Sequence, residues 1–192
     1  THKMTQRILH IKNMVCPRCI MAVKDIFNQL EIQYQDVQLG QVIVSDHLDQ
    51  DKLLLLDDKL NALGFELLEP GKSALISQIK SVIIDQVHHK KEPLSINFSS
   101  LISDKLHHEY AYLSRLFSSV EGITIEKFIV LQKIEKVKEY LTYNQMTLSE
   151  IADEMSYSNV AYLSSQFKKE TGMTPTQFKG QTSHHRKPLD KL

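Results

Sequence analysis

The sequence predicts an α+β domain of order βαββαβ, followed by an all-α domain. Two observations predict this division. Up to residue 70, short alternating segments are interspersed with segments of helical periodicity, whereas beyond residue 73 the strand signals vanish and an internal repeat follows. The length of 192 residues accommodates two small domains, each with its own core. The composition, 42% hydrophobic and 24% charged, is that of an ordinary globular protein.

The first domain is expected over residues 6–70. The alternation in RILHIK predicts a half-buried strand over 7–12, and apolar residues at three- and four-residue spacing predict a helix over 17–30 with Pro17 in its first turn. Residues 37–46 predict two strands that turn at Gly40-Gln41, and a second helix over 51–63 is expected to end at Gly64. FELL, over 65–68, predicts the last short strand before Pro70-Gly71.

The second domain is expected over residues 73–181, with a polar tail over 182–192. Residues 74–88 predict a helix whose buried stripe is Leu75, Ile79, Val82, Ile83 and Val87. The loop HKKEPL follows, and a long helix is expected over 125–141, with a buried stripe formed by Phe128, Leu131, Ile134, Val137 and Leu141.

An internal repeat with an offset of 50 residues organises this second domain. When residues 99–128 are aligned with 149–178, nine of thirty positions are identical, and YLSRLFSSVEGITIEKF lies over YLSSQFKKETGMTPTQF. Each copy has the pattern of a short helix, a tight turn and a second helix. The sequence therefore predicts two helix-turn-helix units, at about 95–122 and 146–172, joined by the long helix.

Capping signals mark the second copy. Thr147 and Glu150 form a capping box, Ser158 is expected to cap a helix over 159–170, and Gly172 ends it before Thr174-Pro175 starts another. Leu163, Phe167 and Tyr162 are expected to face the core. The residues expected to face outward are Glu109, Tyr110, Ala111, Ser114 and Arg115 in the first unit, and Asn159, Ala161, Ser164, Ser165 and Lys168 in the second.

These residues resemble the DNA-binding domain of AraC/XylS-type transcriptional regulators. FKKETGMTPTQF is similar to that family's C-terminal signature, and the resemblance covers roughly residues 73–180. It implies seven helices, cytoplasmic transcriptional control in a bacterium, and two recognition helices in successive major-groove segments of double-stranded DNA. Base contacts would fall on Tyr110, Ala111, Ser114 and Arg115 and on Asn159, Ala161, Ser164 and Ser165, and phosphate contacts near Thr124, Lys168, Lys169 and Thr174.

Two departures from that family affect how the DNA would be read. Ser156 stands where the family usually has Gly in its turn, and the second recognition helix has no Arg at a base-reading position. Bidentate guanine readout is therefore not expected there, and specificity would rest on Arg115, Asn159, hydroxyl groups and DNA shape. The competing interpretation is a helical domain that uses the same packing for protein contacts.

The chain has two cysteines, Cys16 and Cys19, both in the stretch NMVCPRCI. A close pair without a secretion signal indicates metal binding or redox chemistry in a reducing cytosol. One cysteine in the loop and one on the first helical turn can converge on one ion, and two soft thiolates suit Cu(I). Zn(II), Cd(II) or Hg(II) are further candidates, although Zn(II) and Cd(II) would want four ligands; no organic cofactor is expected.

The βαββαβ order with MVCPRC in its first loop resembles a heavy-metal-associated domain, which is a ferredoxin-like module. The family carries Met-x-Cys-x-x-Cys here, so Met14 would tuck inward while Cys16 and Cys19 bind the metal. Asn13 replaces the usual Gly, Val15 the usual Thr, and Pro17-Arg18 the usual small residues. Because Cys-Pro-x-Cys is also typical of dithiol redox proteins, a reversible Cys16–Cys19 disulfide is the alternative, and a retained module with inert cysteines is another.

Together these features predict a one-component regulator that senses a soft metal ion and contacts DNA and RNA polymerase. Residues 1–70 have a net charge of −3 and residues 71–192 of +3, in agreement with a polyanionic partner for the second half. A metal chaperone or docking protein without DNA binding is a second class, and a thiol–disulfide oxidoreductase centred on Cys16 a third. No triad, phosphate loop or carboxylate pair is present, so we expect no enzyme. No apolar run approaches the roughly 20 residues of a membrane span, so none is expected. The protein is expected to be either a monomer or a dimer. The histidine pairs, His88-His89, His107-His108 and His184-His185, are expected to be solvated.

Overall fold

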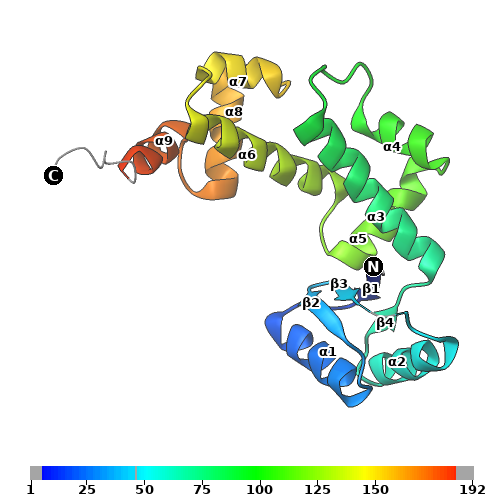
Figure 1. Cartoon of the computed structure of the whole chain (residues 1–192). Helices are drawn as coiled ribbons and strands as arrows, with labels where there is room; N and C mark the ends of the chain where they lie inside the picture. Colours follow the sequence, from blue (N-terminus) through cyan, green and yellow to red (C-terminus); the bar gives the residue numbers. More distant parts are fainter. Residues whose placement is uncertain (1–5, 46, 185–192) are drawn as a thin grey trace, which may run out of the picture. The chain divides into compact units, whose positions relative to one another are not determined.

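The computed structural model describes residues 6–45 and 47–184 (Figure 1). The described chain forms two compact units, each built from two separate segments. Within the described residues, the first comprises 6–45, 47–80 and 102–125, and the second comprises 81–101 and 126–184. This grouping differs from a division at residue 70, because residues 102–125, which contain part of the first repeat copy, belong with the sheet.

A four-stranded antiparallel sheet forms the centre of the first unit. Its strands are β1 (Arg7–Lys12), β2 (Tyr34–Gln38), β3 (Gln41–Val44) and β4 (Glu66–Leu67), in the order β2-β3-β1-β4. The helices α1 (Pro17–Gln29) and α2 (Gln50–Ala62) cover one face of this sheet (Figure 1). The predicted βαββαβ order is confirmed, although β2 begins three residues earlier than expected and β4 keeps only two of its four predicted residues.

The face of the sheet that meets α1 and α2 carries the core of the βαββαβ part. Alternation along β1 and β3 directs Leu9, Ile11, Val42 and Val44 to this side, where they are buried with Phe27 and other apolar side chains. Burying each such side chain contributes roughly 1.5–3 kcal/mol relative to leaving it in water. The hydrophobic alternation read from the sequence therefore determines which face meets the helices.

The opposite face of β1 is covered at its centre. Its residue His10 is 1% exposed, and the helix α5 (Tyr110–Glu121) contacts β1 on the side of the sheet away from α1 and α2 (Figure 1). The His10 Nδ1 lies 2.5 Å from Ser73 Oγ, whose hydroxyl donates to the carbonyl oxygen of Ile8 at 3.2 Å. Because that hydroxyl has a single hydrogen, Nδ1 donates to Ser73, which places the neutral imidazole's proton on Nδ1.

The β2–β3 turn meets the end of α5. Gly40 in this turn has φ +86°, and a Cβ built there would lie 3.1 Å from the carbonyl oxygen of Val120. Beside it, Lys80 Nζ lies 2.7 Å from Glu121 Oε1. The two groups form an ion pair, but their geometry is not that of an aligned hydrogen bond. Lys80 Nζ also donates to Gln41 Oε1 at 3.2 Å. The Lys80 and Glu121 side chains are 20% and 12% exposed, so the pair is largely withdrawn from water.

The helix α3 (Pro70–Ile84) begins four residues before its predicted start and continues into a π-helical turn, η1 (Asp85–His89). Pro70-Gly71 was expected to punctuate the domain, but proline is well tolerated in the first turn of a helix, where its missing N–H has no partner to lose. The buried stripe is Ile76, Ile79, Ile83 and Val87. The predicted members Leu75 and Val82 are only half-buried, so the stripe was assigned one residue off in two of its turns.

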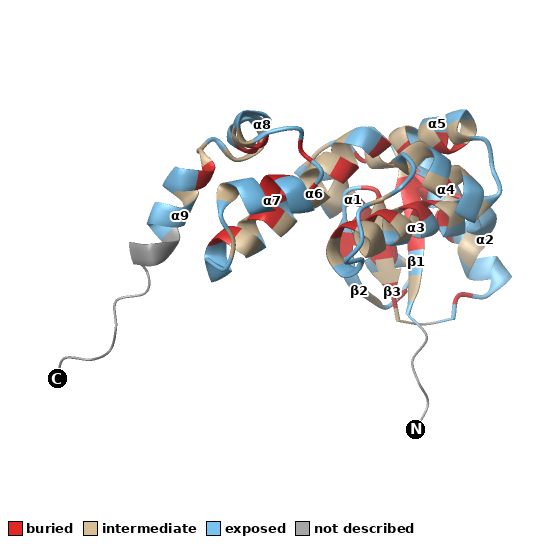
Figure 2. Cartoon of the chain, turned by 90° about the horizontal axis from the view of Figure 1, so that it is seen from above, coloured by how far each residue is buried: buried red, intermediate tan, exposed pale blue. Residues whose placement is uncertain are grey.

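The remaining helices carry the repeat. They are α4 (Phe98–Leu106), α6 (Ile125–Tyr143), α7 (Leu148–Glu154), α8 (Val160–Thr171) and α9 (Pro175–His184). Along α6, Ile129, Ile134, Val137 and Leu141 are buried, whereas the predicted Phe128 and Leu131 are half-buried (Figure 2). The helix has the length needed to join two helix-turn-helix units, as the sequence predicted.

The environment of His10 makes the stability of the first unit depend on pH. Burial, and then the positive charge of Lys80, lower the pKa of His10 from 6.5 to about 4. Between pH 4 and 6.5 the His10 side chain therefore binds a proton in the unfolded chain but not in the folded chain. The free energy of unfolding consequently rises with pH over this range. We expect a loss on the order of 3 kcal/mol as the pH falls from 6.5 to 4.

Urea denaturation across this pH range measures the effect. The variant His10→Gln retains hydrogen-bonding groups for Ser73 but has no titratable ring, so its pH dependence should be shallower than that of the wild type. Identical slopes for the two proteins would contradict the assignment of the buried neutral imidazole.

The close approach of Gly40 and Val120 predicts a difference between two glycine substitutions. Gly40 and Gly64 have nearly the same φ, +86° and +84°, but nothing lies within 4 Å of a Cβ at Gly64. Both Gly→Ala changes should cost about 1–2 kcal/mol from the left-handed backbone, and Gly40→Ala should cost more because its methyl group presses on α5. Equal urea midpoints for the two variants would show that α5 does not rest on this turn.

Candidate functional site

The first helix-turn-helix unit consists of α4 and α5. Leu113, Leu116, Phe117 and Val120 of α5 are buried, which leaves the predicted contact residues on its other side. Ala111 and Arg115 are exposed, and Tyr110 and Ser114 are half-buried. Glu109 is exposed at the N-cap of α5 but makes no side-chain capping bond. The structure therefore brings the five predicted residues together on one end and side of the helix.

The turn of this unit carries the predicted histidine pair. His107 adopts φ 55°, and Ser103 Oγ donates to the carbonyl oxygen of His108 at 2.7 Å. Both imidazoles are exposed, and the ring of His108 lies 5.6 Å from that of Tyr112. These side chains are solvated, as expected.

The second helix-turn-helix unit consists of α7 and α8. Its N-caps differ from the prediction at one position. The capping box is present: Thr147 Oγ1 accepts from Glu150 N and Glu150 Oε2 accepts from Thr147 N. However, α8 begins at Val160, and its N-cap is Asn159 instead of the predicted Ser158. Asn159 Oδ1 accepts from Tyr162 N at 2.7 Å, so only the amide hydrogens of Asn159 remain available to an acceptor on a base.

The outward side of α8 agrees with the sequence except at Tyr162. Ala161, Ser165, Lys168 and Lys169 are exposed and Ser164 is half-buried, whereas Tyr162 is 54% exposed and does not face the core. Its predicted place is taken by Tyr157 of the turn, which is 7% exposed. A tyrosine at either position fits the repeat, and only the geometry of the turn decides which one packs inward.

Tyr157 organises the turn of the second unit. Its hydroxyl donates to Gln166 Oε1 at 2.6 Å, its ring lies 5.8 Å from that of Tyr162, and Lys133 Nζ is 5.4 Å from its ring centre. Burial is the main cause that raises the pKa of Tyr157 to about 12. From the sequence, Tyr157 is expected only to lie in the turn, and its aromatic character at that position was the available signal for its burial.

The preceding residue, Ser156, has a left-handed backbone with φ 58°. This conformation explains why glycine is the residue that the AraC/XylS resemblance predicts here, since a side chain at positive φ costs free energy. The departure at Ser156 thus leaves the turn in place and strains it locally.

The predicted phosphate contacts lie at helix termini. Thr174 caps α9 in a second reciprocal arrangement, with Thr174 N donating to Gln177 Oε1 at 2.9 Å and Gln177 N donating to Thr174 Oγ1 at 3.2 Å. Thr124 is exposed just before α6, and Lys168 and Lys169 occupy the last turn of α8. Within the described ranges, Arg115, Lys168 and Lys169 form no ion pair with a carboxylate. Their charges are available to an external anion.

The cysteines lie at the start of α1. Cys16 is the N-cap residue, in extended conformation, and Cys19 follows in the first turn, with the two Sγ atoms 3.5 Å apart. Both thiols are free and partly exposed. Hydrogen bonding from the backbone of Val15, and then of Cys16, lowers the pKa of Cys19 and favours its thiolate. The pair therefore combines convergence, access and nucleophilic character.

The residues before the cysteines hold the loop. Met14 is 7% exposed and belongs to the core of the sheet, which confirms the expectation that it tucks inward. Asn13 has φ 71°, and its Nδ2 donates to the carbonyl oxygen of Gly64 at 3.1 Å. Asparagine is, after glycine, the residue that most readily adopts this conformation, which explains how Asn13 replaces the usual Gly.

The sulfur separation is compatible with either predicted chemistry. A disulfide requires about 2.05 Å, whereas two bonds of about 2.3 Å meeting at a tetrahedral metal place the sulfur atoms roughly 3.8 Å apart. A small opening accommodates an ion, and a rotation of both side chains closes the disulfide. No group of three or more His, Cys, Asp or Glu side chains suited to a metal occurs in the part of the chain that the structure describes. A four-ligand zinc site would need further ligands from elsewhere.

The other histidine pairs do not join this site. His88 is half-buried with Nε2 2.9 Å from Gln132 Oε1, and His89 is exposed. The solvation predicted for the first pair is thus found for His89, while His88 has a structural partner. His185 lies outside the described residues, as does most of the predicted polar tail.

Comparison with known proteins identifies the repeat. Residues 102–181 match the family described as a helix-turn-helix domain. A segment of 60 residues is 32% identical to the "Bifunctional transcriptional activator/DNA repair enzyme AdaA" of Bacillus subtilis (strain 168), covering 31% of this chain and 28% of that protein. Residues 102–181 form a helix-turn-helix domain.

Solved structures show the fold of this helical part. An AraC-type transcriptional regulator from Chromobacterium violaceum is 18% identical with a TM-score of 0.51, over 60% of this chain and 97% of its own. The C-terminal domain of AraT, a response regulator from Geobacillus stearothermophilus, is 22% identical with a TM-score of 0.49, over 65% and 93%. The likeness to the Chromobacterium violaceum structure, which contains an AraC-type DNA-binding domain, shows the fold of the helical part.

The repair activity in the name AdaA is said of a protein of which this chain spans only 28%. Among the described helices, none combines the length and apolarity needed to cross a bilayer.

The strained turn at Ser156, in the second helix-turn-helix unit, predicts a stabilising substitution. Ser156→Gly removes the steric cost of positive φ and should raise the free energy of unfolding by about 0.5–1 kcal/mol after the greater flexibility of unfolded glycine is subtracted. Urea or thermal denaturation measures it. The neighbouring Ser158→Gly, where φ is not positive, is the matched control and should destabilise; a loss of stability in both variants would contradict the interpretation.

Proposed function

We propose that this protein is a DNA-binding transcriptional regulator of the AraC type whose activity responds to the Cys16–Cys19 thiols. The observation that supports DNA binding best is the repeated unit, since α5 and α8 each direct a polar, largely exposed side away from their buried residues. A helix presented in this way fits the major groove, while neighbouring helix starts offer backbone N–H groups to phosphates.

The predicted contacts have distinct roles in this proposal. Arg115 is the one guanidinium in the set and reads a base in the first half of the site, while Asn159 contributes its amide hydrogens in the second. Lys168, Lys169, Thr124 and Thr174 contact phosphates. The remaining members of the interface, Glu109, Tyr110, Ala111, Ser114, Ala161, Ser164 and Ser165, set shape and local hydrogen bonding. RNA polymerase is the further partner, and the protein acts in the cytoplasm as a monomer or a dimer.

For the N-terminal part we propose a ferredoxin-like, heavy-metal-associated domain that binds a soft ion, preferentially Cu(I), through Cys16 and Cys19. The strand order β2-β3-β1-β4, the two helices on one face and the buried Met14 support this proposal. Two thiolates at the start of a helix match the softness of Cu(I), and the backbone hydrogen bonds that lower the pKa of Cys19 favour its thiolate. The chain's own contribution is to hold the two sulfurs convergent and to keep Met14 out of the site.

Contacts within the first unit support coupling between the thiols and the first recognition helix. The β2–β3 turn lies at the end of β1 that leads into the cysteine loop, because Ile11 N donates to the carbonyl oxygen of Gly40 at 2.9 Å. The same glycine lies against the carbonyl oxygen of Val120, and Lys80 contacts both Gln41 and Glu121. A change in the loop therefore has a short route through β1 to the last turn of α5. A coupling free energy of about 1–3 kcal/mol would suffice for regulation.

A second candidate function is a thiol redox switch. It is favoured by the same 3.5 Å sulfur separation together with the lowered pKa of Cys19, since a thiolate close to its partner is the attacking species in disulfide formation. In that case a Cys16–Cys19 disulfide, formed at the expense of a disulfide or peroxide oxidant, replaces the metal as the signal.

DNA binding is tested by selecting duplexes from a random library and measuring anisotropy across a series of salt concentrations. Lys168→Gln and Lys169→Gln should each weaken binding to every sequence and reduce the salt slope by about one, because each removes a phosphate contact. Arg115→Gln should cost about 1–3 kcal/mol and relax one base position. Lys24→Gln, an exposed residue of α1, is the control.

The thiol response is measured in the same assay under anaerobic conditions, with reduced protein, with Cu(I) and after oxidation. We expect Cu(I) to change the DNA affinity roughly 5- to 150-fold, and Cys16→Ser/Cys19→Ser to abolish the change. A response to oxidation alone would favour the redox switch. If no sequence is selected and the salt slope is near zero, the DNA-binding proposal fails and a metal chaperone or docking protein replaces it.

A further inference from the structure

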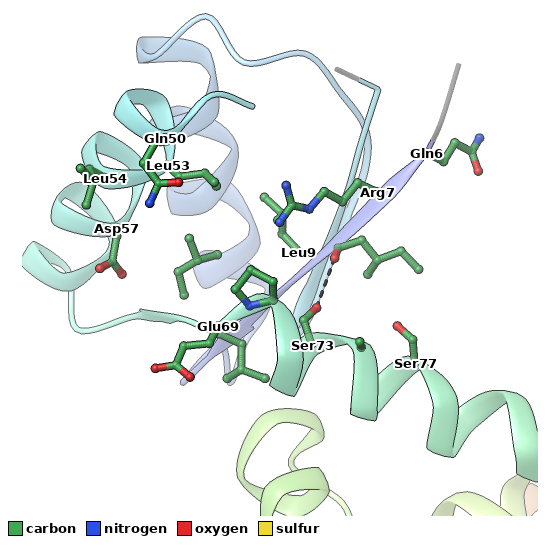
Figure 3. Close-up of a pocket in the computed structure, with 15 residues that line it drawn as sticks. Gln6, Arg7, Leu9, Gln50, Leu53, Leu54, Asp57, Glu69, Ser73 and Ser77 are labelled. Atoms are coloured by element: carbon green, nitrogen blue, oxygen red, sulfur yellow. Dashed lines mark hydrogen bonds between the residues drawn. The ribbon is translucent and has the colours of Figure 1, made fainter. Parts of the chain in front are cut away.

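A cavity of about 560 Å³ lies in the first unit beside the edge of the sheet, and its lining includes neither cysteine and no residue of α5 or α8 (Figure 3). It exists because β4 is only two residues long. β4 pairs with Ile11 and Lys12, so the N-terminal half of β1, from Arg7 to Leu9, pairs with β3 on one side and faces the cavity on the other. The volume falls in the range typical of small-molecule sites, about 300–1,000 Å³.

The walls of the cavity are mainly apolar. Leu9 and Leu68 are buried, Leu53 and Leu67 are half-buried, and Leu54 at the rim is 57% exposed. An exposed leucine beside a concave apolar surface is a feature that burial within this unit does not explain, and it is typical of a ligand site.

Two charged side chains face the cavity from opposite walls. Arg7 projects from β1 and Asp57 from α2, and both are half-buried (Figure 3). Neither forms an ion pair with any other described side chain. Glu69, which is exposed, adds a second carboxylate on the side away from Arg7. The cavity therefore offers a cation on one wall and carboxylates on another, with leucines between them.

The edge of β1 adds backbone hydrogen-bonding groups. The carbonyl oxygen of His10 accepts from Leu68 N at 2.8 Å and that of Ile8 accepts from Ser73 Oγ at 3.2 Å, so the even-numbered residues direct their backbone groups to this side. The N–H of Ile8 therefore points towards the cavity at a level that β4 does not reach. An extended chain could add to the sheet here as a short further strand.

We propose that this cavity binds a short apolar peptide, laid along β1 with its terminal carboxylate at Arg7 and its terminal ammonium at Asp57. The leucine walls hold its side chains, and the opposite charges select a molecule that is ionised at both ends. A fatty acid would use Arg7 and the leucines but would gain nothing from Asp57, so it fits the site less well.

Calorimetric titration of the full chain with trileucine tests the proposal. Saturable binding is expected, and Arg7→Gln and Asp57→Asn should each weaken it about tenfold or more, as expected for the loss of a charge-assisted hydrogen bond. Lys52→Gln and Asp58→Asn, which remove exposed charges on α2 outside the cavity, should leave binding unchanged. Ala74→Phe fills the cavity from an exposed position of α3 and should abolish binding without unfolding the protein.

Chemical blocking of the peptide termini gives a second, independent test. Acetylation of the ammonium should weaken binding to the wild type but not further weaken binding to Asp57→Asn, and amidation of the carboxylate should behave likewise with Arg7→Gln. The proposal is overturned if trileucine does not bind, if these effects are additive, or if dodecanoate binds in an Arg7-dependent manner while trileucine does not. DNA binding and the thiol response are measured separately, so they stand or fall independently.

Discussion

The burial of the centre of β1 from both sides, by Leu9 and Ile11 on one face and His10 on the other, is the constraint on which the first unit depends. Leu9 and Ile11 pack towards α1 and α2, while His10 is enclosed on the other side by α3 and α5. An antiparallel sheet with helices on one face commonly exposes the other. Here that second face is occupied by the helix proposed to read DNA. The thiol loop, which follows directly after β1, is thus attached to a strand that the recognition helix contacts.

A buried imidazole and a largely buried ion pair make this second interface polar. Such groups add little net stability, because the cost of removing charges from water offsets much of their attraction. They do require their partners: a shift of α5 along the sheet would leave Lys80 or Glu121 without its counter-charge. The interface therefore favours one position of α5 over neighbouring ones. Coupling between two sites is carried by elements that have such discrete arrangements.

Hydrophobic alternation and capping patterns were enough to predict the strand order, the two helix-turn-helix units and the placement of the cysteines. The errors arose where two residues of one kind compete. Ser158 and Asn159 are both good N-caps, and Tyr157 and Tyr162 can both pack into the core of the second helix-turn-helix unit. Three-dimensional geometry alone decides which member of each pair does so. His10 gave no signal, since one polar residue in an alternating strand is ordinarily solvated, and its burial results from a helix 100 residues away in the sequence. The cavity was equally hidden, because it results from the shortness of β4.

The first unit is discontinuous in the chain, and this affects how it can form during synthesis. Residues 1–80 emerge from the ribosome well before residues 102–125, with 81–101, which belong to the other unit, in between. Until α5 has been made, the second face of the sheet has only the cover that α3 gives it, and the groups that α5 buries must remain hydrated or be shielded by another protein. Any boundary chosen for an isolated fragment meets the same difficulty: a piece that ends after α3 would carry the cysteines but present His10, Lys80 and Gln41 to water. The sheet and α5 therefore have to be kept together in any fragment or fusion that is meant to preserve this unit.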